Sequence, residues 1–206
     1  MSCLEIRIHG RGGQGAVTAA ELIAVAAFYD GKFSQAFPSF GVERRGAPLE
    51  AYARIDNKFI KIRSQVYQPD FIILQDPTLI SSVDVLAGAK KNALVIVNST
   101  KKPTELGLTG EVKIKTVPAT QIANETLGKP IINTALLGAW AGASGLVKLE
   151  SLKKAIMERF PGELGQKNYK AAKLAYCHMS PKDKYCFVAE PNGKVPAGDE
   201  RFGVST

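Results

Sequence analysis

Residues 6–15 constrain the fold of this chain more than any other stretch. A short strand with alternating apolar residues enters a turn there that contains Gly10, Gly12, Gly13 and Gly15. An alanine-rich segment, residues 16–28, follows directly and has the composition of a packed helix. A strand, a glycine-rich turn and a helix open a βαβ unit, in which glycines let the backbone come close to a phosphate group or to another polypeptide.

The rest of the chain alternates strand-like and helix-like segments. Strands are expected at residues 4–9, 32–37, 71–74, 93–97 and 112–117, and a β-hairpin at residues 52–55 and 59–62. Helices are expected at residues 16–28, 78–89, 118–127, 131–146, 150–160 and 163–178. The alanine and glycine content of residues 131–146 predicts a helix that packs very closely against a neighbour.

This order of elements predicts an α/β fold. We expect a doubly wound, mostly parallel sheet with a β-hairpin insertion and a helical C-terminal part. Residues 1–178 are expected to form one domain. Residues 179–206 contain Pro181, Pro191 and Pro196 with several glycines, which predicts an extended C-terminal tail.

Charge and cysteine content exclude several classes of function. The formal net charge is +8, but the basic residues are spread along the chain, so no nucleic-acid partner is expected. Cys3, Cys177 and Cys186 lack a Cys-x-x-Cys spacing, so we expect no metal site, and any iron–sulfur cluster would belong to another chain. Without a signal-like N-terminus or a membrane-length apolar run, the chain is expected to be cytoplasmic, with reduced thiols and no membrane contact.

The glycine turn is the first candidate binding site. Gly10, Gly12 and Gly15 satisfy the Gly-x-Gly-x-x-Gly pattern of dinucleotide-binding loops, and Arg11 adds a positive charge that can help to hold a phosphate. The acidic residue that would bond the ribose is missing, because residues 37–39 are Phe-Pro-Ser. The turn can equally pack against another subunit, and the residues leave both interpretations open.

A second candidate is the loop that contains Glu43, Arg44, Arg45 and Gly46. Two guanidinium groups on a loop after a strand can bind an anion or pair with carboxylates across an interface, while an internal ion pair is the plainer alternative. No catalytic set is expected. His9 should be a buried structural residue, and His178 should lie at a helix end, where the helix dipole favours it.

Several motifs, taken together in order and spacing, resemble the gamma subunit of the pyruvate:ferredoxin oxidoreductase (2-oxoacid:acceptor oxidoreductase) family. They are Gly10-Arg11-Gly12-Gly13-Gln14-Gly15, Ala19-Ala20-Glu21-Leu22, Ala36-Phe37-Pro38-Ser39-Phe40-Gly41, Glu43-Arg44-Arg45-Gly46-Ala47-Pro48, Asp70, Asp76-Pro77, Asn133-Thr134-Ala135, Leu137-Gly138-Ala139 and Asn168 with Lys170-Ala171-Ala172. The similarity extends to about residue 178, where gamma chains of the family usually end. The segment from residue 179 onward departs from that pattern.

The resemblance implies a non-catalytic subunit of a hetero-oligomeric enzyme. Such enzymes oxidatively decarboxylate a 2-oxoacid such as pyruvate and transfer the acyl group to coenzyme A. They use thiamine diphosphate on alpha and beta subunits and iron–sulfur clusters on beta and ferredoxin-like delta subunits. Ferredoxin, or NAD through an additional flavin subunit, takes the electrons, and this chain alone is expected to hold no cofactor.

We expect the glycine turn and the second loop to face partner subunits, and the two anion-capable loops suggest the hypothesis that their residues contact a cofactor, coenzyme A. The candidate residues are Gly10, Arg11, Gly12, Gly13, Gln14, Gly15, Glu43, Arg44, Arg45 and Asn133. A pure assembly scaffold without ligand contact is one alternative. A free-standing NAD(P)-binding oxidoreductase of the Rossmann type is the other.

Overall fold

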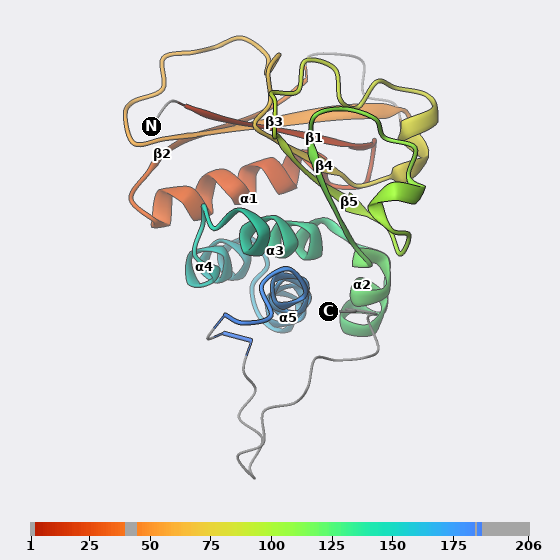
Figure 1. Cartoon of the computed structure of the whole chain (residues 1–206). Coiled ribbons are helices and arrows are strands. Elements are labelled where there is room, and N and C mark those ends of the chain that lie inside the picture. Colours follow the sequence, from red (N-terminus) through yellow and green to blue (C-terminus); the bar gives the residue numbers. More distant parts are fainter. Residues whose placement is uncertain (1–2, 40–44, 184, 187–206) are drawn as a thin grey trace.

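The computed structural model describes residues 3–39, 45–183 and 185–186. One layer is a six-stranded mixed sheet in the order β2-β3-β1-β4-β5-β6 (Figure 1). Its strands are β1 (Leu4–Arg11), β2 (Phe33–Pro38), β3 (Pro48–Asp56), β4 (Phe71–Leu74), β5 (Leu94–Asn98) and β6 (Lys113–Val117). β1, β4, β5 and β6 run parallel to one another, whereas β3 is antiparallel to both β1 and β2.

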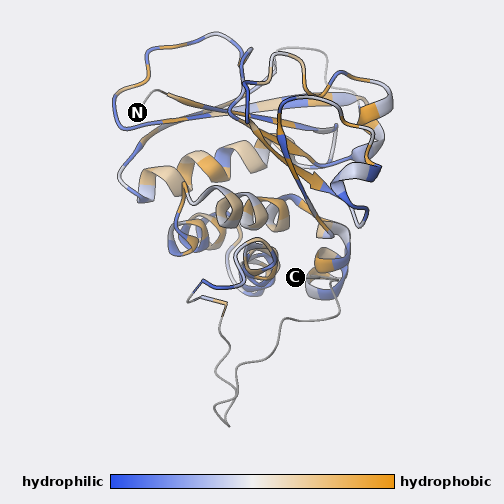
Figure 2. Ribbon diagram, in the orientation of Figure 1, coloured by the Kyte–Doolittle hydropathy of each residue, from blue (hydrophilic) through white to orange (hydrophobic). Residues whose placement is uncertain are grey.

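Helices form the second layer and cover one face of the sheet (Figure 1). They are α1 (Ala16–Tyr29), α2 (Ala119–Leu127), α3 (Asn133–Ser144), α4 (Leu149–Arg159) and α5 (Glu163–Met179), with short 3-10 helices η1 (Pro77–Ser81) and η2 (Pro103–Glu105). The α/β class predicted from the sequence is confirmed. Hydrophobic residues concentrate on the inner strands and where the helices meet, which marks the main core (Figure 2).

The close helix contact predicted for residues 131–146 is confirmed between α3 and α5. A Cβ atom added at Gly138 would clash with the carbonyl of Ala172, and one at Gly142 would clash with the carbonyl of Tyr176. Only glycine lets the two backbones approach this closely. Trp140 of α3 is 1% exposed and its ring meets Phe71 edge to face, which anchors the helical layer on the sheet.

The hairpin predicted at residues 52–55 and 59–62 is wrong. β3 is one continuous strand that pairs antiparallel with β1 on one side and with β2 on the other, so β3 alone runs against the direction of the other strands. Residues 59–62 form no strand; Ile60 is buried, and its carbonyl accepts a hydrogen bond from Nε2 of Gln35 at 3.0 Å. Only Ile60 of this segment is buried, so its mixture of apolar and polar residues imitates the pattern of a strand without forming one.

The helix predicted at residues 78–89 is also wrong, because the chain forms only η1 and then a series of turns. A guanidinium nitrogen of Arg7 donates hydrogen bonds to the backbone carbonyls of Val85 and Ala87. These carbonyls therefore have a hydrogen-bond partner without the backbone N–H groups of a helix. Leu79 and Val85 nevertheless pack on the second face of the sheet, which this segment covers.

The segment after α5 folds back on the helices. Cys177 and Cys186 form a disulfide with their Cα atoms 5.3 Å apart, which corrects the prediction of reduced thiols. The hydroxyl of Ser180 donates to the carbonyl of Gly142, and that of Tyr176 donates to Asp183. Residues 187–206 of the predicted tail lie outside the described residues, so the boundary at residue 178 stays a prediction. Among the described helices, none has the length and apolar character needed to cross a bilayer.

Candidate site at the glycine turn

The glycine turn joins the carboxyl end of β1 to the first turn of α1, as predicted. Gly13 and Gly15 have φ values of +94° and +78°, which side chains rarely tolerate. A Cβ atom at Gly15 would also lie 2.9 Å from Nδ2 of Asn133, and one at Gly10 would clash with the side chain of Gln75. The glycines therefore let β1 and α1 pack directly against the end of β4 and the start of α3.

Gln14 closes the turn from within. Its side-chain Oε1 accepts a hydrogen bond from the backbone N–H of Arg11 at 2.8 Å, and its own N–H donates to the carbonyl of Arg11 at 2.9 Å. The amide is thus used to shape the backbone. Gln14 therefore fixes the backbone conformation of the turn.

Arg11 acts as a tether between three segments. Its Nε donates to Oδ2 of Asp76 at 2.7 Å, and its two terminal nitrogens donate to the carbonyl of Gly46 at 3.1 Å and to Oγ1 of Thr78 at 2.8 Å. All three guanidinium nitrogens therefore already have partners inside the chain. The charge of Arg11 is largely neutralised by Asp76, so this residue organises the site.

Asp76 holds the other end of that tether and caps η1. Its Oδ1 accepts from the backbone N–H and the hydroxyl of Thr78, at 2.9 and 2.6 Å. Burial by itself would raise the pKa of Asp76, but the hydrogen bonds from Thr78 and Arg11 together hold that pKa below its usual value. The carboxylate therefore stays ionised at neutral pH and keeps its ion pair with Arg11.

The second predicted loop lies directly beside the glycine turn. Gly12 donates to the carbonyl of Ala47 at 3.0 Å, and Gly46 donates to the carbonyl of Gly12 at 3.1 Å, so the two loops form a short parallel bridge. Arg45 is exposed, and a Cβ atom at Gly13 would lie 4.0 Å from its Cγ. Within the described residues its guanidinium has no hydrogen-bond or ion-pair partner. Glu43 and Arg44, predicted with it, lie outside the described residues.

Asn133 is 5% exposed and sits at the start of α3. Its Oδ1 accepts a hydrogen bond from the N–H of Thr134 at 2.9 Å. The hydroxyl of Thr134 in turn donates to Oδ1 of Asn168 on α5 at 2.9 Å. These residues, which are part of the resemblance noted above, join the helical layer to the underside of the glycine turn.

His9 has the structural character expected from the sequence. It is 2% exposed, and its Nδ1 lies 3.4 Å from Oε1 of Glu50. Burial lowers the pKa of His9 to about 4, although Glu50 acts in the opposite direction, so the ring is neutral at neutral pH. The described residues contain no group of three His, Cys, Asp or Glu side chains placed to hold a metal ion.

Sequence reasoning missed Gln75 and Thr78. Gln75 is 1% exposed and its side chain lies against Gly10, while the hydroxyl of Thr78 accepts a hydrogen bond from Arg11. Gln75 directly follows the buried strand β4, and polar residues at the carboxyl ends of neighbouring parallel strands meet at one edge of the sheet. That position was the signal by which Gln75 could have been found; Thr78 has no such signal.

The topology argues against a dinucleotide site. In dinucleotide-binding folds the second parallel strand lies next to the first and presents its acidic end to the ribose. Here the antiparallel β3 lies next to β1, so β2 is one strand further away, and it ends at Phe37 and Pro38. The strand that follows α1 therefore brings no acidic residue beside β1, and the NAD(P)-binding alternative is not supported.

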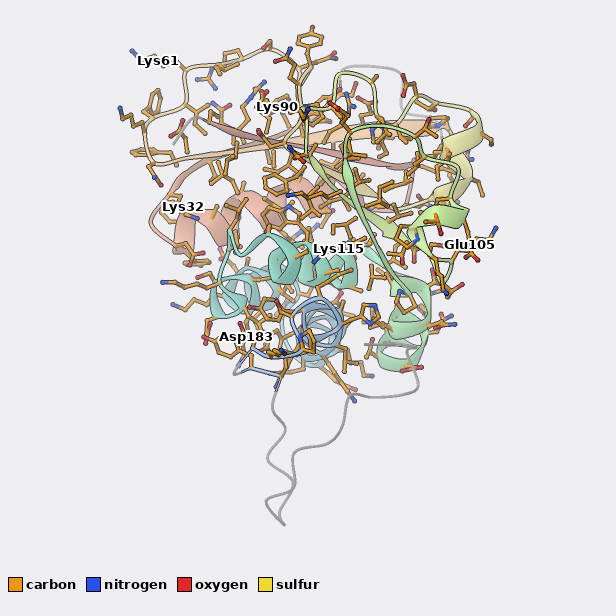
Figure 3. The ribbon with its side chains drawn as sticks, in the orientation of Figure 1. Lys32, Lys61, Lys90, Glu105, Lys115 and Asp183 are labelled. Atoms are coloured by element: carbon orange, nitrogen blue, oxygen red, sulfur yellow. A yellow bond between two sulfur atoms is a disulfide. The ribbon has the colours of Figure 1, made fainter. Side chains whose placement is uncertain are left out.

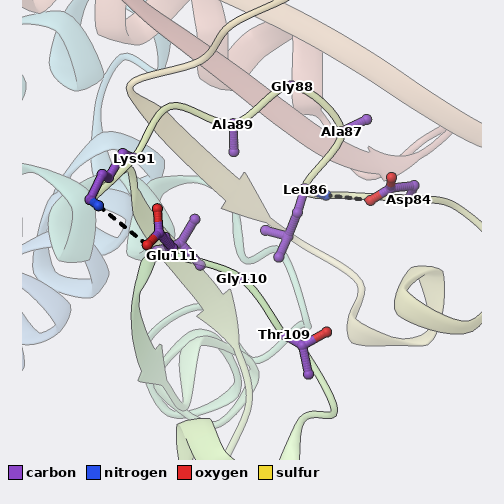
Figure 4. A pocket seen from close by; sticks show the side chains of 10 residues that line it. Asp84, Leu86, Ala87, Gly88, Ala89, Lys91, Thr109, Gly110 and Glu111 are labelled. Carbon is purple, nitrogen blue, oxygen red and sulfur yellow. Dashed lines mark hydrogen bonds and ion pairs between the residues drawn. The ribbon is translucent and has the colours of Figure 1, made fainter.

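A shallow cavity of about 430 Å³ lies at the other end of the strands from the glycine turn, at the amino ends of β5 and β6 (Figure 4). Its lining includes Asp84, which accepts a hydrogen bond from the N–H of Leu86, and the ion pair of Lys91 with Glu111 at 3.2 Å. None of the predicted site residues lines it. The candidate site around the glycine turn lies away from this cavity.

Comparisons with known proteins agree on one family. Residues 5–177 match the pyruvate ferredoxin/flavodoxin oxidoreductase family. The chain is 57% identical over 179 residues to pyruvate synthase subunit PorC of Methanocaldococcus jannaschii, which covers 87% of this chain and 98% of the relative. It is 56% identical over 176 residues to the common gamma subunit of pyruvate/ketoisovalerate oxidoreductases of Pyrococcus furiosus, covering 84% of this chain and 95% of that one.

Solved structures show the same fold. The crystal structure of pyruvate oxidoreductase subunit PORC from Thermotoga maritima matches with a TM-score of 0.76 and 36% identity, over 85% of this chain and 96% of that chain. A 2-oxoglutarate:ferredoxin oxidoreductase from Magnetococcus marinus shares the fold at a TM-score of 0.70 and 19% identity, over 89% of this chain and 32% of that longer chain. The chain belongs to the pyruvate ferredoxin/flavodoxin oxidoreductase family, in which it corresponds to the gamma subunit.

Proposed function

We propose that this gamma subunit serves the oxidative decarboxylation of a 2-oxoacid to acyl-coenzyme A by supplying a contact surface, while the catalytic groups belong to partner subunits. The surface is formed by the glycine turn and the adjoining loop at Arg45 and Gly46. Relatives that are more than half identical are named as pyruvate synthase subunits or as a subunit common to pyruvate and ketoisovalerate oxidoreductases. Pyruvate is therefore the first substrate to test, followed by branched, aromatic and dicarboxylic 2-oxoacids.

Arg45 carries the more specific proposal that this surface contacts coenzyme A. Its exposed guanidinium has no partner among the described residues, and the backbone bonds of Gly12 with Gly46 and Ala47 hold its loop beside the amino end of α1. A helix amino end and an exposed guanidinium both favour an anion, such as the phosphates of coenzyme A. When bound, coenzyme A would supply the thiol that accepts the acyl group.

The remaining residues of the turn prepare this surface. Arg11 is neutralised by Asp76 and holds the carbonyl of Gly46, so it fixes the loop on which Arg45 stands. Gln14 fixes the backbone of the turn in the same way from the other side. Rigid placement reduces the entropy that must be lost when a flexible ligand binds.

The proposal includes the rest of the assembly. Alpha and beta subunits would hold thiamine diphosphate, beta and delta subunits would hold the iron–sulfur clusters, and ferredoxin would accept the electrons. An NAD-reducing flavin subunit is the alternative acceptor. We place the complex in the cytoplasm, in line with the expectation from the sequence.

Steady-state kinetics of the intact complex tests the role of Arg45. Replacing Arg45→Ala should raise KM for coenzyme A by about tenfold, which is the worth of one charge-assisted hydrogen bond, and leave KM for the 2-oxoacid unchanged. Arg159→Ala is the matched control, because Arg159 is also exposed but lies at the end of α4. An unchanged KM for coenzyme A, or loss of assembly instead, refutes the contact with coenzyme A.

A further inference from the structure

The two edges of the sheet differ in character. β6 forms one edge and presents Lys113 and Lys115 to solvent, which is a common way to prevent a free strand from pairing with another chain. β2 forms the other edge, has no charged residue, and leaves Phe33 48% exposed. Among the described strands β2 pairs only with β3, so its outer backbone groups have no partner strand there.

Exposed apolar side chains gather beside the free edge of β2. Phe33 and Phe59 meet edge to face with ring centroids 6.2 Å apart, although Phe59 is 66% exposed. Phe28 near the end of α1 and Ile62 are 69% and 45% exposed. We call β2 together with these four residues the β2 flank. Exposed apolar residues that gather on one surface mark a site of protein contact.

The apolar residues of the β2 flank are held in place. Phe59 and Ile62 stand on either side of Ile60, which is only 5% exposed and anchors the loop. The hydrogen bond from Gln35 of β2 to the carbonyl of Ile60, at 3.0 Å, fixes the same loop against the sheet. The flank is therefore preformed, and its exposed rings need not be reordered when a partner binds.

The rim of the β2 flank is mostly basic, and its acidic neighbour, Asp56, accepts a hydrogen bond from the backbone N–H of Lys58. Lys58, Lys61 and Arg63 are exposed on the loop that carries Phe59, and no acidic side chain of the described residues pairs with them. Lys32 lies on the same side of the molecule as Lys61 (Figure 3), but its Nζ donates to the carbonyl of Leu146 and is engaged within the chain. The partner of this surface should therefore be apolar at its centre and acidic around it.

The β2 flank is distinct from the glycine turn. Along the antiparallel register, Phe33 pairs with Asp56 at one end of β3, whereas Pro48 at the other end of β3 pairs with Arg11. Phe33 and the glycine turn therefore lie at opposite ends of the strands. A partner on the β2 flank and a ligand at Arg45 can be tested independently.

We propose that the β2 flank docks a partner subunit of the same oxidoreductase through an extended, acidic segment that adds a strand along β2. An unpaired strand edge provides backbone hydrogen bonds, while neighbouring apolar side chains and charges select the sequence that binds. The inference rests on membership in a family of multi-subunit enzymes and not on the proposed contact with coenzyme A.

Subunit recovery from the assembled complex tests the proposal. In the tagged full-length chain, the double substitution Phe59→Asp with Lys61→Glu should lower the recovery of partner subunits per tagged chain by about tenfold or more. Tyr67→Asp is the control, because Tyr67 is 67% exposed in the same connection but lies beside Gly88, outside the β2 flank. Circular dichroism and thermal unfolding of each variant report whether the chain itself still folds.

The possible results distinguish a partner subunit on the β2 flank from a second copy of this chain. If the double variant does not fold, the single variants Lys61→Glu and Ile62→Asp, both at exposed positions, replace it and must show the same selective loss. Normal recovery with a folded variant overturns the proposal. It is also overturned if the unsubstituted chain alone forms a dimer that the double substitution dissociates, because the flank then binds a second copy. Either result leaves the Arg45→Ala test of coenzyme A unaffected.

Discussion

Nε of Arg11 donates to Oδ2 of Asp76 at 2.7 Å, and this contact ties the end of β1 to the turn that follows β4. The same guanidinium holds the carbonyl of Gly46, so one residue positions both loops of the candidate site. An arginine inside a phosphate-binding pattern is therefore engaged within the chain. Arg45, an exposed cation beside the turn, comes from a different segment.

Removing the tether should destabilise the chain. Arg11→Ala leaves the carboxylate of Asp76 partly buried without its arginine partner, so we expect the free energy of unfolding to fall by about 1–3 kcal/mol. Urea denaturation measures this. Arg159→Ala, at an exposed position where the guanidinium lies over the ring of Phe160, should change it by only about 0.5 kcal/mol. An equally small change for Arg11→Ala would contradict the tether.

Glycine at position 15 should be required for two separable reasons. Gly15→Ala combines a positive φ with a clash against Asn133, whereas Gly31→Ala has a similar φ of +74° and open space around it. We expect Gly31→Ala to cost about 1 kcal/mol of unfolding free energy and Gly15→Ala about 2 kcal/mol or more. Equal costs in thermal unfolding would show that packing against Asn133 is unimportant.

The protonation of His9 should make stability depend on pH. Its pKa is lowered to about 4 in the folded chain from an ordinary value near 6.5, so the unfolded chain binds the extra proton between these values. Stability from His9 is therefore complete above about pH 6.5 and is lost as pH falls toward 4. Proton NMR titration should find His9 neutral at pH about 5.5. A protonated ring at that pH would refute the account.

The disulfide should stabilise the segment that follows α5. Cys177 and Cys186 are nine residues apart, and closing a loop of this size stabilises a folded chain by about 2–3 kcal/mol in the chain-entropy model. Cys186→Ser should therefore lower the unfolding free energy by about that amount. Alkylation of the unreduced chain followed by mass spectrometry should modify Cys3 alone. Modification of all three cysteines would rule out the disulfide.

Much of the fold could be predicted from local pattern, because buried strands and amphipathic helices carry their own signal. The apolar run Phe71–Leu74 is a strand with the predicted limits, and α5 (Glu163–Met179) extends one residue beyond its predicted end. The errors arose where a distant residue decides the conformation. Arg7 donates hydrogen bonds to the carbonyls of residues 85 and 87, and no local sequence pattern predicts a partner so far along the chain.

The candidate site was predictable only in part, for the same reason. The glycines announce a close backbone approach, and the turn does join a strand to a helix. The separate roles of Arg11 and Arg45 could not be assigned, because the partners of Arg11 lie 65 and 67 residues away in the sequence. The roles of Glu43 and Arg44 stay predictions.

Purification of the tagged chain from cells that produce its partners, followed by an activity assay, tests the central claim most directly. The account predicts partner subunits in stoichiometric amounts and acceptor reduction that requires both a 2-oxoacid and coenzyme A, while the isolated chain shows no binding of NADH by calorimetry. A chain that purifies alone and binds NADH tightly would contradict it, because the glycine turn would then serve a dinucleotide.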